Sequence, residues 1–537
     1  MRTEINERIA SVATREGGAP DGESAPVTSA DLAAIRDLIS AFVPKRAIVA
    51  VVTRGDGRFL EIGRRAWHFP RQSDGRYLGY HPGDSLAAIA CLQAVRAQGA
   101  AFLLVPAAFV WWLEHYDDFE HHLSQNYVRV TDEGAVLFDL RHHRASTRAR
   151  VNANLSQLLS RSEAALGRPP SVLDCWSGAD VAAAFPKVAV FEPPDAEREL
   201  PYLDKTFDFV VVGTNGASLE EAIRVGQVVV TAEASEHPGR GTRWRVTHDG
   251  RGEERVLPSA TIVIPCYDGW AITETCLRMV RETLPPGGDH EVLVIDDAST
   301  DGSGEKLKAF AKAFPQMQVV RNRKNRGFIE SCNLGVRLAS NEGVVFLNND
   351  TIPLPGWLEP LLATLDEPEV GLVGGKLLWP DGILQEAGGV VFSNARGANF
   401  GRGSPTPAAP LFNYRRPVDY CSGALLGVRR SDFLGLGGFD RRYRPAYYED
   451  TDLAFSVRNA RRSVVFNPES VVLHLEGASS STSAGPGTKR FQELNREKFA
   501  RKWRAALTRQ PHPPGRFDSD TWFRLAASGP HPSEGML

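Results

Sequence analysis

The sequence lacks the features that mark several classes of protein. Its 537 residues include six cysteines, which are scattered and form no Cys-x-x-Cys pair. This spacing argues against a zinc site and a disulfide framework, and favours reduced thiols in a cytoplasmic chain. No apolar run is long enough to span a bilayer, and the charged start Met1-Arg2-Thr3-Glu4 has no signal-peptide core.

An excess of charge of either sign is also missing. Charged residues make up 24% of the chain and hydrophobic residues 42%, and the formal net charge is −3. The chain therefore lacks the basic surplus of a general nucleic-acid binder, and we expect no nucleic-acid partner. A chain of this length exceeds one compact core, which predicts two or three domains.

Composition and periodicity divide the chain into six regions. We expect a disordered leader over 1–30, a small α/β module of unknown role over 31–150, a small α/β spacer over 165–235, a linker with at most one strand over 236–257, a catalytic α/β domain over 258–508 and a flexible tail over 509–537. Stretches 171–178 and 200–211 resemble fragments of an S-adenosylmethionine-dependent methyltransferase. Cys175-Trp176-Ser177-Gly178 replaces the usual Gly-x-Gly there, so the resemblance implies a degenerate methyltransferase-like piece.

The first module holds a cluster of aromatic and histidine residues, namely Trp111, Trp112, His115, His121 and His122. One interpretation is an aromatic platform for a sugar or acceptor. The other places Trp112 in the core and the histidines on a helix surface. Aromatic residues at helical spacing usually form core, so we favour the second interpretation.

Strand and helix signals alternate regularly from Ala260 onward. Apolar strands are predicted at 261–264, 292–295, 318–320 and 344–347, with helices at 270–280, 307–314 and 328–338. Short crossovers between such strands indicate βαβ units and a parallel sheet buried on both faces. The glycine-rich stretch 379–416 fits either an acceptor loop or a flexible insertion, and 418–428 is predicted as a further buried strand.

Polar residues gather where these predicted strands end. The second strand is followed by Asp296 and Asp297, the third by Asn325 and Gly327, and the fourth by Asn348-Asn349-Asp350. Open α/β sheets bind ligands at this edge, and a carboxylate there suits a hard divalent cation with a diphosphate.

A second acidic group, Glu449-Asp450-Thr451-Asp452, opens an apparent helix. Acidic residues stabilise a helix N-terminus through the helix dipole, so these carboxylates alone do not indicate catalysis. The alternative is a catalytic acidic motif that accepts a proton.

These motifs together resemble the family 2 glycosyltransferases of GT-A fold, and most of all their rhamnosyltransferase-like branch. The resemblance covers about 258–505, and it rests on Thr261-Ile262-Val263-Ile264-Pro265, Asp296-Asp297-Ala298-Ser299, Asn325-Arg326-Gly327, Asn348-Asn349-Asp350, Gly437-Gly438-Phe439-Asp440, Glu449-Asp450-Thr451-Asp452 and His474. It implies a nucleotide-diphospho-sugar transferase domain, with Rossmann-like α/β architecture, attached to an unassigned N-terminal α/β region.

The resemblance also implies roles for individual residues. Asp297 contacts the nucleotide base, and the donor-binding set is completed by Pro265, Asp296, Asn325, Gly327, Asn348 and Asn349. Asn348 stands where the family's Asp-x-Asp motif has its first carboxylate. Asp350 is therefore the expected main ligand of Mn²⁺ or Mg²⁺, with His474 as a second ligand. Asp450 is the expected general base, with Glu449 as the second choice.

The implied reaction is an inverting, metal-dependent transfer from a nucleoside-diphosphate sugar to a hydroxyl of a glycan or lipid-linked acceptor in bacterial surface polysaccharide synthesis. A lipid-linked acceptor implies peripheral contact with the inner face of the cytoplasmic membrane. One alternative is a sugar-phosphate nucleotidyltransferase, which requires a basic glycine-rich loop where Pro265-Cys266-Tyr267-Asp268 stands. Another is a non-catalytic carbohydrate-binding scaffold, which Asn348 favours and the intact Asp350 and Asp450 oppose.

Overall fold

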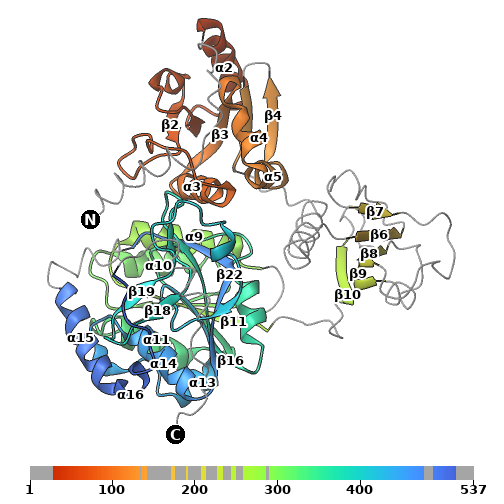
Figure 1. The fold of residues 1–537 in the computed structure, drawn as a ribbon. Coiled ribbons are helices and arrows are strands. Elements are labelled where there is room, and N and C mark those ends of the chain that lie inside the picture. Colours follow the sequence, from red (N-terminus) through yellow and green to blue (C-terminus); the bar gives the residue numbers. More distant parts are fainter. Residues whose placement is uncertain are drawn as a thin grey trace. The chain divides into compact units, whose positions relative to one another are not determined.

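The computed structural model describes residues 28–132, 135–141, 171–175, 189–191, 207–212, 226–233, 243–248, 258–285, 289–476 and 488–515. The predicted leader lies almost wholly outside these residues, and so does most of the predicted tail. The chain divides into two compact units, one drawn from 1–120, 130–137 and 257–537 and the other from 121–129 and 138–256. Figure 1 shows the elements of both.

The second unit contains a five-stranded sheet of order β10-β9-β8-β6-β7. Its strands are β6 (Ser171–Cys175), β7 (Ala189–Phe191), β8 (Phe207–Val212), β9 (Gly226–Glu233) and β10 (Arg243–His248). All neighbours pair in parallel except β9 and β10, which are antiparallel. Strand β10 therefore extends this sheet into the stretch predicted as a linker. The glycine turn of the methyltransferase resemblance, 176–178, lies outside the described residues.

The N-terminal module is a second five-stranded sheet, of order β2-β1-β3-β5-β4. Its strands are β1 (Ile48–Val52), β2 (Arg65–Phe69), β3 (Ala100–Pro106), β4 (Val128–Asp132) and β5 (Ala135–Asp139), and its helices are α2 (Ser29–Phe42), α3 (Ser85–Ala97), α4 (Trp111–His115) and α5 (Asp117–Asn126), with short 3-10 turns η1 (Gly57–Leu60) and η2 (Ala107–Phe109). Trp112 is 1% exposed, and Phe69 packs against it. Trp112 is thus a core residue, and His115 and His121 are exposed.

Within the first unit, α3 packs against the domain predicted over 258–508, which is named the catalytic domain after that prediction. Ala90, Ala94 and Ala97 belong to the same buried apolar cluster as residues of the catalytic sheet. Arg96 forms an ion pair with Glu282 at 2.6 Å, and the Ala408 N–H donates to Asp84 Oδ2 at 2.7 Å. Small residues allow this close approach, since a Cβ on Gly382 would lie 2.6 Å from the Ala87 carbonyl oxygen.

The catalytic domain is built on a ten-stranded mixed sheet. Its parallel half has the order β13-β12-β11-β14, with β11 (Ala260–Cys266), β12 (Glu291–Asp296), β13 (Met317–Arg321) and β14 (Gly343–Leu347). These strands coincide with the four predicted ones. Helices α9 (Trp270–Thr283), α10 (Ser303–Ala311) and α11 (Phe328–Leu338) connect them, as the apolar periodicity predicted.

The other half of the sheet is mostly antiparallel. It comprises β15 (Thr351–Pro353), β16 (Val370–Leu378), β17 (Leu384–Glu386), β20 (Arg416–Pro417), β21 (Leu425–Arg429) and β22 (Ser463–His474), and β18 (Gly389–Val391) pairs with β19 (Gly397–Asn399) beside it. The strand predicted over 418–428 is wrong at its start, since β21 begins at Leu425 and a turn precedes it. The glycine-rich stretch is not a flexible insertion, because Val391, Phe392 and Phe400 are buried in the core.

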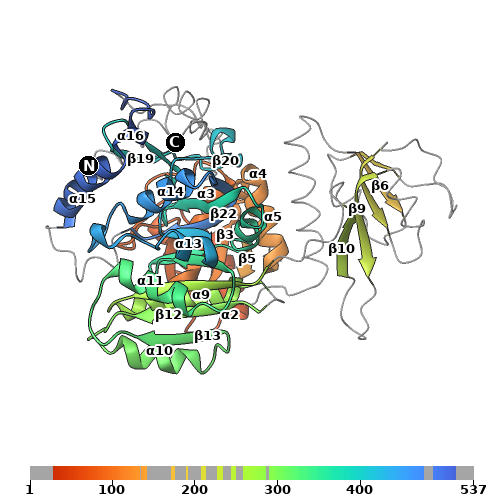
Figure 2. The same ribbon diagram turned by 90° about the horizontal axis from the view of Figure 1, so that it is seen from below.

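Apolar side chains fill both faces of the catalytic sheet. Val263 faces one buried cluster, while Ile262 and Ile264 face the other, as expected for alternating side chains in a strand covered on both faces. The covering helices include α12 (Glu359–Leu365), α13 (Arg430–Gly435), α14 (Glu449–Asn459), α15 (Thr488–Lys502) and α16 (Arg504–Leu507), with 3-10 turns η3 (Pro410–Phe412) and η4 (Arg441–Tyr443). Helices α15 and α16 lie together at one edge of the domain in both ribbon views (Figure 2).

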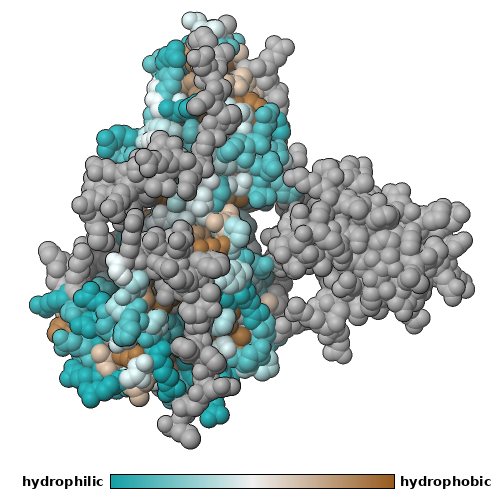
Figure 3. Space-filling view, viewed as in Figure 1, coloured by the Kyte–Doolittle hydropathy of each residue, from teal (hydrophilic) through white to brown (hydrophobic). Residues whose placement is uncertain are grey.

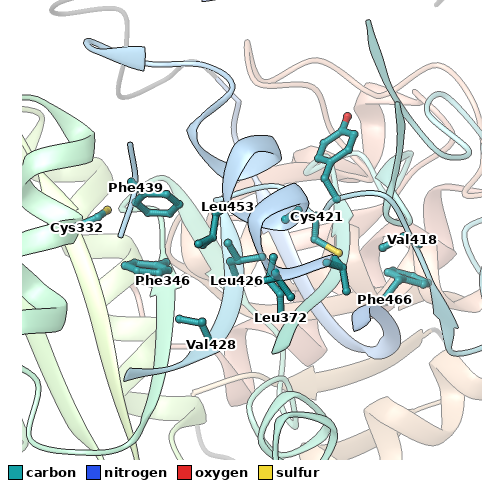
Figure 4. Close-up of a cluster of buried hydrophobic side chains, with 14 of the residues drawn as sticks. Cys332, Phe346, Leu372, Val418, Cys421, Leu426, Val428, Phe439, Leu453 and Phe466 are labelled. Atoms are coloured by element: carbon teal, nitrogen blue, oxygen red, sulfur yellow. The ribbon is translucent and has the colours of Figure 1, made fainter. Parts of the chain in front are cut away.

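One face of the described surface is drawn in Figure 3. On the face drawn in Figure 3, hydrophilic residues predominate and hydrophobic residues form small separate groups. Among the described residues, no helix combines the length and apolar character needed to cross a membrane. The large apolar side chains lie instead in clusters such as that of Figure 4, where Phe346 and Phe439 pack with ring centroids 5.0 Å apart.

Candidate active site

The parallel strands end at a common rim. Register pairs Cys266 of β11 with Asp296 of β12, and Asp296 with Arg321 of β13. Polar residues that follow these strands therefore emerge side by side, as the sequence predicted. Pro265 is the buried penultimate residue of β11, so it lies directly beneath this rim.

Asp296 and Asp297 are held by the chain itself. Asp296 is 0% exposed, accepts from the Ser299 N–H at 2.9 Å, and forms an ion pair with Arg321 at 2.5 Å. Through these contacts, Asp296 stabilises the turn after β12 and orients the Arg321 side chain. A direct nucleotide contact by Asp296 stays a prediction.

Asp297 organises the loop that follows β13. Its carboxylate accepts from the backbone N–H of Arg326 at 2.9 Å and of Gly327 at 2.7 Å, and from Asn322 Nδ2 at 2.7 Å. Gly327 adopts a φ of 83°, a region that favours glycine, and it opens α11. Asn325 is exposed at the tip of this loop. Asp297 thereby brings Asn325 and Gly327 to the rim.

The stretch after β14 turns tightly. The Asn348 carbonyl accepts from the Thr351 hydroxyl at 2.7 Å, and the Asn349 side chain donates to Thr273 of α9 at 2.8 Å. Asn349 thus links the end of β14 to α9. A contact between Asn349 and the nucleotide stays a prediction. Asn348 is half-buried, and Asp350 is 2% exposed.

Asp350 and His474 face each other across two paired strands. Thr351 of β15 pairs with His474 of β22, which places His474 Nε2 3.4 Å from Asp350 Oδ1. The other ring nitrogen, Nδ1, lies 2.8 Å from Gln385 Oε1, and Gln385 Nε2 donates to Glu476 at 3.0 Å. Because Gln385 offers an oxygen, Nδ1 donates its proton to Gln385, and Nε2 is the ring nitrogen that faces Asp350.

These two residues fit a cation whose remaining ligands come from a substrate. Among the residues that the structure describes, no group of three His, Cys, Asp or Glu side chains could form a complete protein shell. A carboxylate and a neutral imidazole suit Mn²⁺ or Mg²⁺ when diphosphate oxygens fill other positions. The donor set is thus compatible with a cation shared between protein and substrate.

The acidic motif lies at the start of α14. The Asp450 carboxylate accepts from the Gly423 N–H at 3.0 Å and from the Thr451 N–H at 2.7 Å. Burial raises the pKa of Asp450, and the hydrogen bonds from Gly423 and Thr451 oppose that rise. A carboxylate with a raised pKa is a stronger base than an exposed aspartate.

Glu449 and Asp452 have different surroundings. Burial, reinforced by the Asp450 charge, raises the pKa of Glu449 to about 8, and Glu449 Oε2 has no partner among the described residues. Asp452 accepts from Tyr443 at 2.8 Å, Lys502 at 2.7 Å and Trp503 at 2.7 Å. Asp452 therefore attaches the C-terminal helices rather than facing a substrate.

Two neighbours of the rim, Gln385 and Glu386, were not singled out in the sequence. Glu386 accepts from the Ser422 N–H at 2.8 Å. Gln385 and Glu386 lie in the stretch first interpreted as a loop or insertion. The available signal was two polar residues between the apolar Leu384 and Ala387, a pattern too short to identify a strand.

Comparison with known families and proteins gives consistent matches. Residues 261–401 match the family model described as Glycosyl transferase family 2. Among curated proteins, the chain is similar to the O-antigen biosynthesis protein RfbC of Myxococcus xanthus, with 29% identity over 51% of this chain and 22% of that protein. It is also similar to the glycosyltransferase AglE of Haloferax volcanii, with 30% identity over 24% of this chain and 42% of that protein. The matches span less than half the length of these relatives.

Solved structures also align with the chain. One is GalNAc-T7 with UDP, GalNAc and Mn²⁺, with a TM-score of 0.40, 18% identity and coverage of 47% of this chain and 50% of that one. Another is the mannosyltransferase PcManGT from Pyrobaculum calidifontis in complex with GDP-Man and Mn²⁺, with a TM-score of 0.35, 21% identity and coverage of 48% and 67%.

Proposed function

Because this chain contains a family 2 glycosyltransferase domain, we propose that it moves a sugar from a nucleoside-diphosphate sugar to a hydroxyl of a glycan or lipid-linked acceptor, with inversion at the anomeric carbon. The family predicted from the sequence is confirmed over 261–401, and the predicted α/β architecture is confirmed by the mixed sheet and its helices. The GT-A fold is part of this proposal. The rhamnosyltransferase-like branch stays a prediction. A role in bacterial surface polysaccharide synthesis is supported by the similarity to a protein named for O-antigen biosynthesis.

One arrangement carries this proposal. The Asp350–His474 pair and the Asp450 carboxylate both lie at the edge where the strands of the catalytic sheet end, one after β14 and the other beside the turn that leads into β21. A donor whose diphosphate binds at the first would present its sugar toward the second. That geometry suits displacement at an anomeric carbon.

The rim after β12 and β13 supplies the nucleotide end of the site in this proposal. Asp297 holds the exposed Asn325 and the Gly327 backbone in place, and Asp296 aims Arg321 toward the same edge. Pro265 and Asn348 border this edge, and Asn349 supports it through α9. An amide and a guanidinium can hydrogen-bond a base, a ribose or a phosphate.

Asp350 and His474 would hold a divalent cation, Mn²⁺ or Mg²⁺, together with the diphosphate. A bound cation would offset the negative charge that grows on the departing diphosphate. Hydrogen bonds within the chain orient this proposed metal site. Gln385 fixes the tautomer of His474, and Glu476 fixes the orientation of the Gln385 amide. We propose this pair as the metal ligands, with Asn348 leaving one fewer carboxylate than the family pattern has.

Asp450 is the proposed general base, with Glu449 as the second candidate. The acceptor hydroxyl oxygen bonds to the anomeric carbon, the bond from that carbon to the diphosphate oxygen breaks, and its electron pair leaves with the nucleoside diphosphate. Asp450 takes the hydroxyl proton as the new bond forms. A lipid-linked acceptor would bring the chain to the inner face of the cytoplasmic membrane, and we propose that as its place of action.

A donor screen tests this function. Wild-type protein is incubated with Mn²⁺ and UDP-, GDP- and dTDP-sugars, and release of nucleoside diphosphate is followed with and without EDTA. We expect metal-dependent turnover of at least one donor, including slow hydrolysis when no acceptor is added. Absence of both turnover and metal-dependent binding for every donor would reject the proposed function.

A further inference from the structure

Strand β17 contacts both the proposed metal site, at Asp350 and His474, and the acidic motif at Asp450. Its consecutive residues Gln385 and Glu386 point to opposite sides, as neighbours in a strand do. Gln385 contacts His474, while Glu386 Oε1 accepts from the Ser422 N–H at 2.8 Å. Gln385 thus supports the proposed metal ligand His474, and Glu386 lies beside the acidic motif.

Glu386 and Asp450 hold two consecutive peptide groups. The Ser422 N–H donates to Glu386, and the Gly423 N–H donates to Asp450 at 3.0 Å. The preceding residue, Cys421, is anchored in the core beside Leu372 and Leu426 (Figure 4). The 421–423 turn is therefore anchored in the core through Cys421, and the Glu386 and Asp450 carboxylates that accept from it are near enough to interact electrostatically.

The second oxygen of Glu386 is not used by the part of the protein that the structure describes. Glu386 is 1% exposed, and its Oε2 has no hydrogen-bond partner among the residues that the structure describes. The charged groups around it are Asp450 and Glu476, which disfavour ionisation, and Arg402, which favours it, while Tyr420 and Cys421 lie in the same electrostatic environment. Burial is the largest influence and raises the pKa of Glu386 to about 8.

We propose that Glu386 is a substrate-binding residue that works as a neutral carboxylic acid, with its Oε2 hydroxyl donating a hydrogen bond to a hydroxyl of the sugar that reacts beside Asp450. Two carboxylates this close do not both ionise readily, so a proton kept on Glu386 leaves Asp450 free to act as the base. A protonated carboxyl has one O–H to donate, whereas an ionised one can only accept. This inference rests on the proposed function.

Two substitutions separate the polar role from a packing role. Glu386→Gln keeps an acceptor for Ser422 and a donor for the sugar but cannot ionise. Glu386→Met has a similar size and neither group. We expect Glu386→Gln to keep kcat/KM within a few-fold of the wild type near pH 7. Glu386→Met should lower kcat/KM by about tenfold or more, because the site then loses its hydrogen bond to the sugar hydroxyl. Melting temperature and Mn²⁺-dependent UDP binding show whether each variant is folded.

The pH profile provides the readout that a structural role would not change. In the wild type, kcat/KM should fall above about pH 8 as Glu386 loses its proton, and Glu386→Gln should remove that fall. Glu291→Gln is the matched control, since Glu291 is another buried glutamate. It lies at the start of β12, at the end of that strand away from the rim. Its pH profile should equal that of the wild type. Equal kcat/KM and equal pH profiles for wild type, Gln and Met would overturn the proposal.

A second measurement does not depend on turnover. Carbon-13 NMR of protein labelled at glutamate Cδ would identify the Glu386 signal by its loss in Glu386→Gln. The proposal predicts that this signal titrates above pH 7. Titration below pH 5 would contradict the neutral acid, even if no donor were turned over. Failure of the donor screen alone would instead count against the proposed function.

Discussion

At the scale of single residues, the contacts of His474 are the most informative. An imidazole can bind a cation only through a nitrogen that carries a lone pair, and the Gln385 oxygen fixes which nitrogen that is. Gln385 is itself oriented by Glu476, which accepts also from Trp379 at 3.0 Å. A residue that is not a ligand therefore sets the geometry of the proposed metal corner.

Gln385→Leu should weaken Mn²⁺ binding in the presence of UDP by about 10- to 100-fold, because supporting hydrogen bonds of metal ligands typically have this effect. Electron paramagnetic resonance of free Mn²⁺ measures it. Trp379→Phe is the control, since it removes a hydrogen bond from the same network without touching His474. Equal Mn²⁺ affinity in Gln385→Leu and the wild type would show that Gln385 does not position the imidazole.

Glu449 predicts a dependence of stability on pH. Burial raises its pKa to about 8 in the folded state, above its ordinary value of 4.5. The neutral side chain is thus favoured by folding, so its contribution is fully present below pH 4.5 and is lost as the pH rises through 8. The free energy of unfolding of the wild type should therefore decrease between pH 4.5 and pH 8.

Glu449→Gln should therefore gain stability relative to the wild type as the pH is raised from 5 to 8, measured by urea unfolding at each pH. Glu493→Gln is the control, because Glu493 is exposed and its pKa is lowered by a hydrogen bond from Arg496. That variant should show no such gain. A constant difference between Glu449→Gln and the wild type over this range would refute the shifted pKa.

At the scale of elements, local patterns predicted the parallel half of the catalytic sheet. Strands β11, β12, β13 and β14 are apolar runs bounded by polar residues, so each could be located from its own sequence. The antiparallel half could not, because its pairing depends on contacts far apart in the chain. Strand β17 has three residues and no periodicity, and it contributes the two side chains that sequence analysis missed.

The acidic motif illustrates the same limit within one helix. Its three carboxylates are chemically similar in the sequence, yet Asp450 accepts from the turn at Gly423 and Asp452 accepts from Lys502 and Trp503. Which carboxylate faces the substrate side follows from the direction of α14 relative to the sheet. Local sequence does not contain that information.

Asp452→Asn should loosen the C-terminal helices α15 and α16. The change weakens hydrogen bonds to Tyr443, Lys502 and Trp503 around a side chain that is 2% exposed, so we expect a loss on the order of 2 kcal/mol. Chemical unfolding measures it. Asp440→Asn, which affects a more exposed partner of Lys502, should cost clearly less. Similar losses in both variants would argue against Asp452 as the main attachment.

At the scale of the whole molecule, the part of the N-terminal module up to residue 120 belongs to the same compact unit as the catalytic domain. Helix α3 shares an apolar cluster with the catalytic sheet, and Asp84 and Arg96 add polar contacts. The loop around Gly382, which precedes β17, packs against Ala87 of this helix. The module therefore supports the stretch that carries Gln385 and Glu386.

Gly382→Ala should destabilise the protein more than Gly403→Ala. Both glycines have positive φ, 83° and 91°, so both substitutions strain the backbone. A Cβ at Gly382 meets Ala87 at 2.6 Å, whereas a Cβ at Gly403 meets nothing within 4 Å. The extra loss should be about 1–3 kcal/mol, as for other overpacked sites. Equal melting temperatures for the two variants would mean that α3 is not packed here.

We propose that this molecule transfers a sugar with Asp450 as the base. The most direct measurement compares wild type and Asp450→Asn for turnover and for Mn²⁺-dependent binding of a donor that the wild type uses. Loss of a general base typically lowers the rate by about 10²- to 10⁴-fold. We expect a fall of this size in turnover with donor affinity unchanged. Turnover equal to that of the wild type would contradict it.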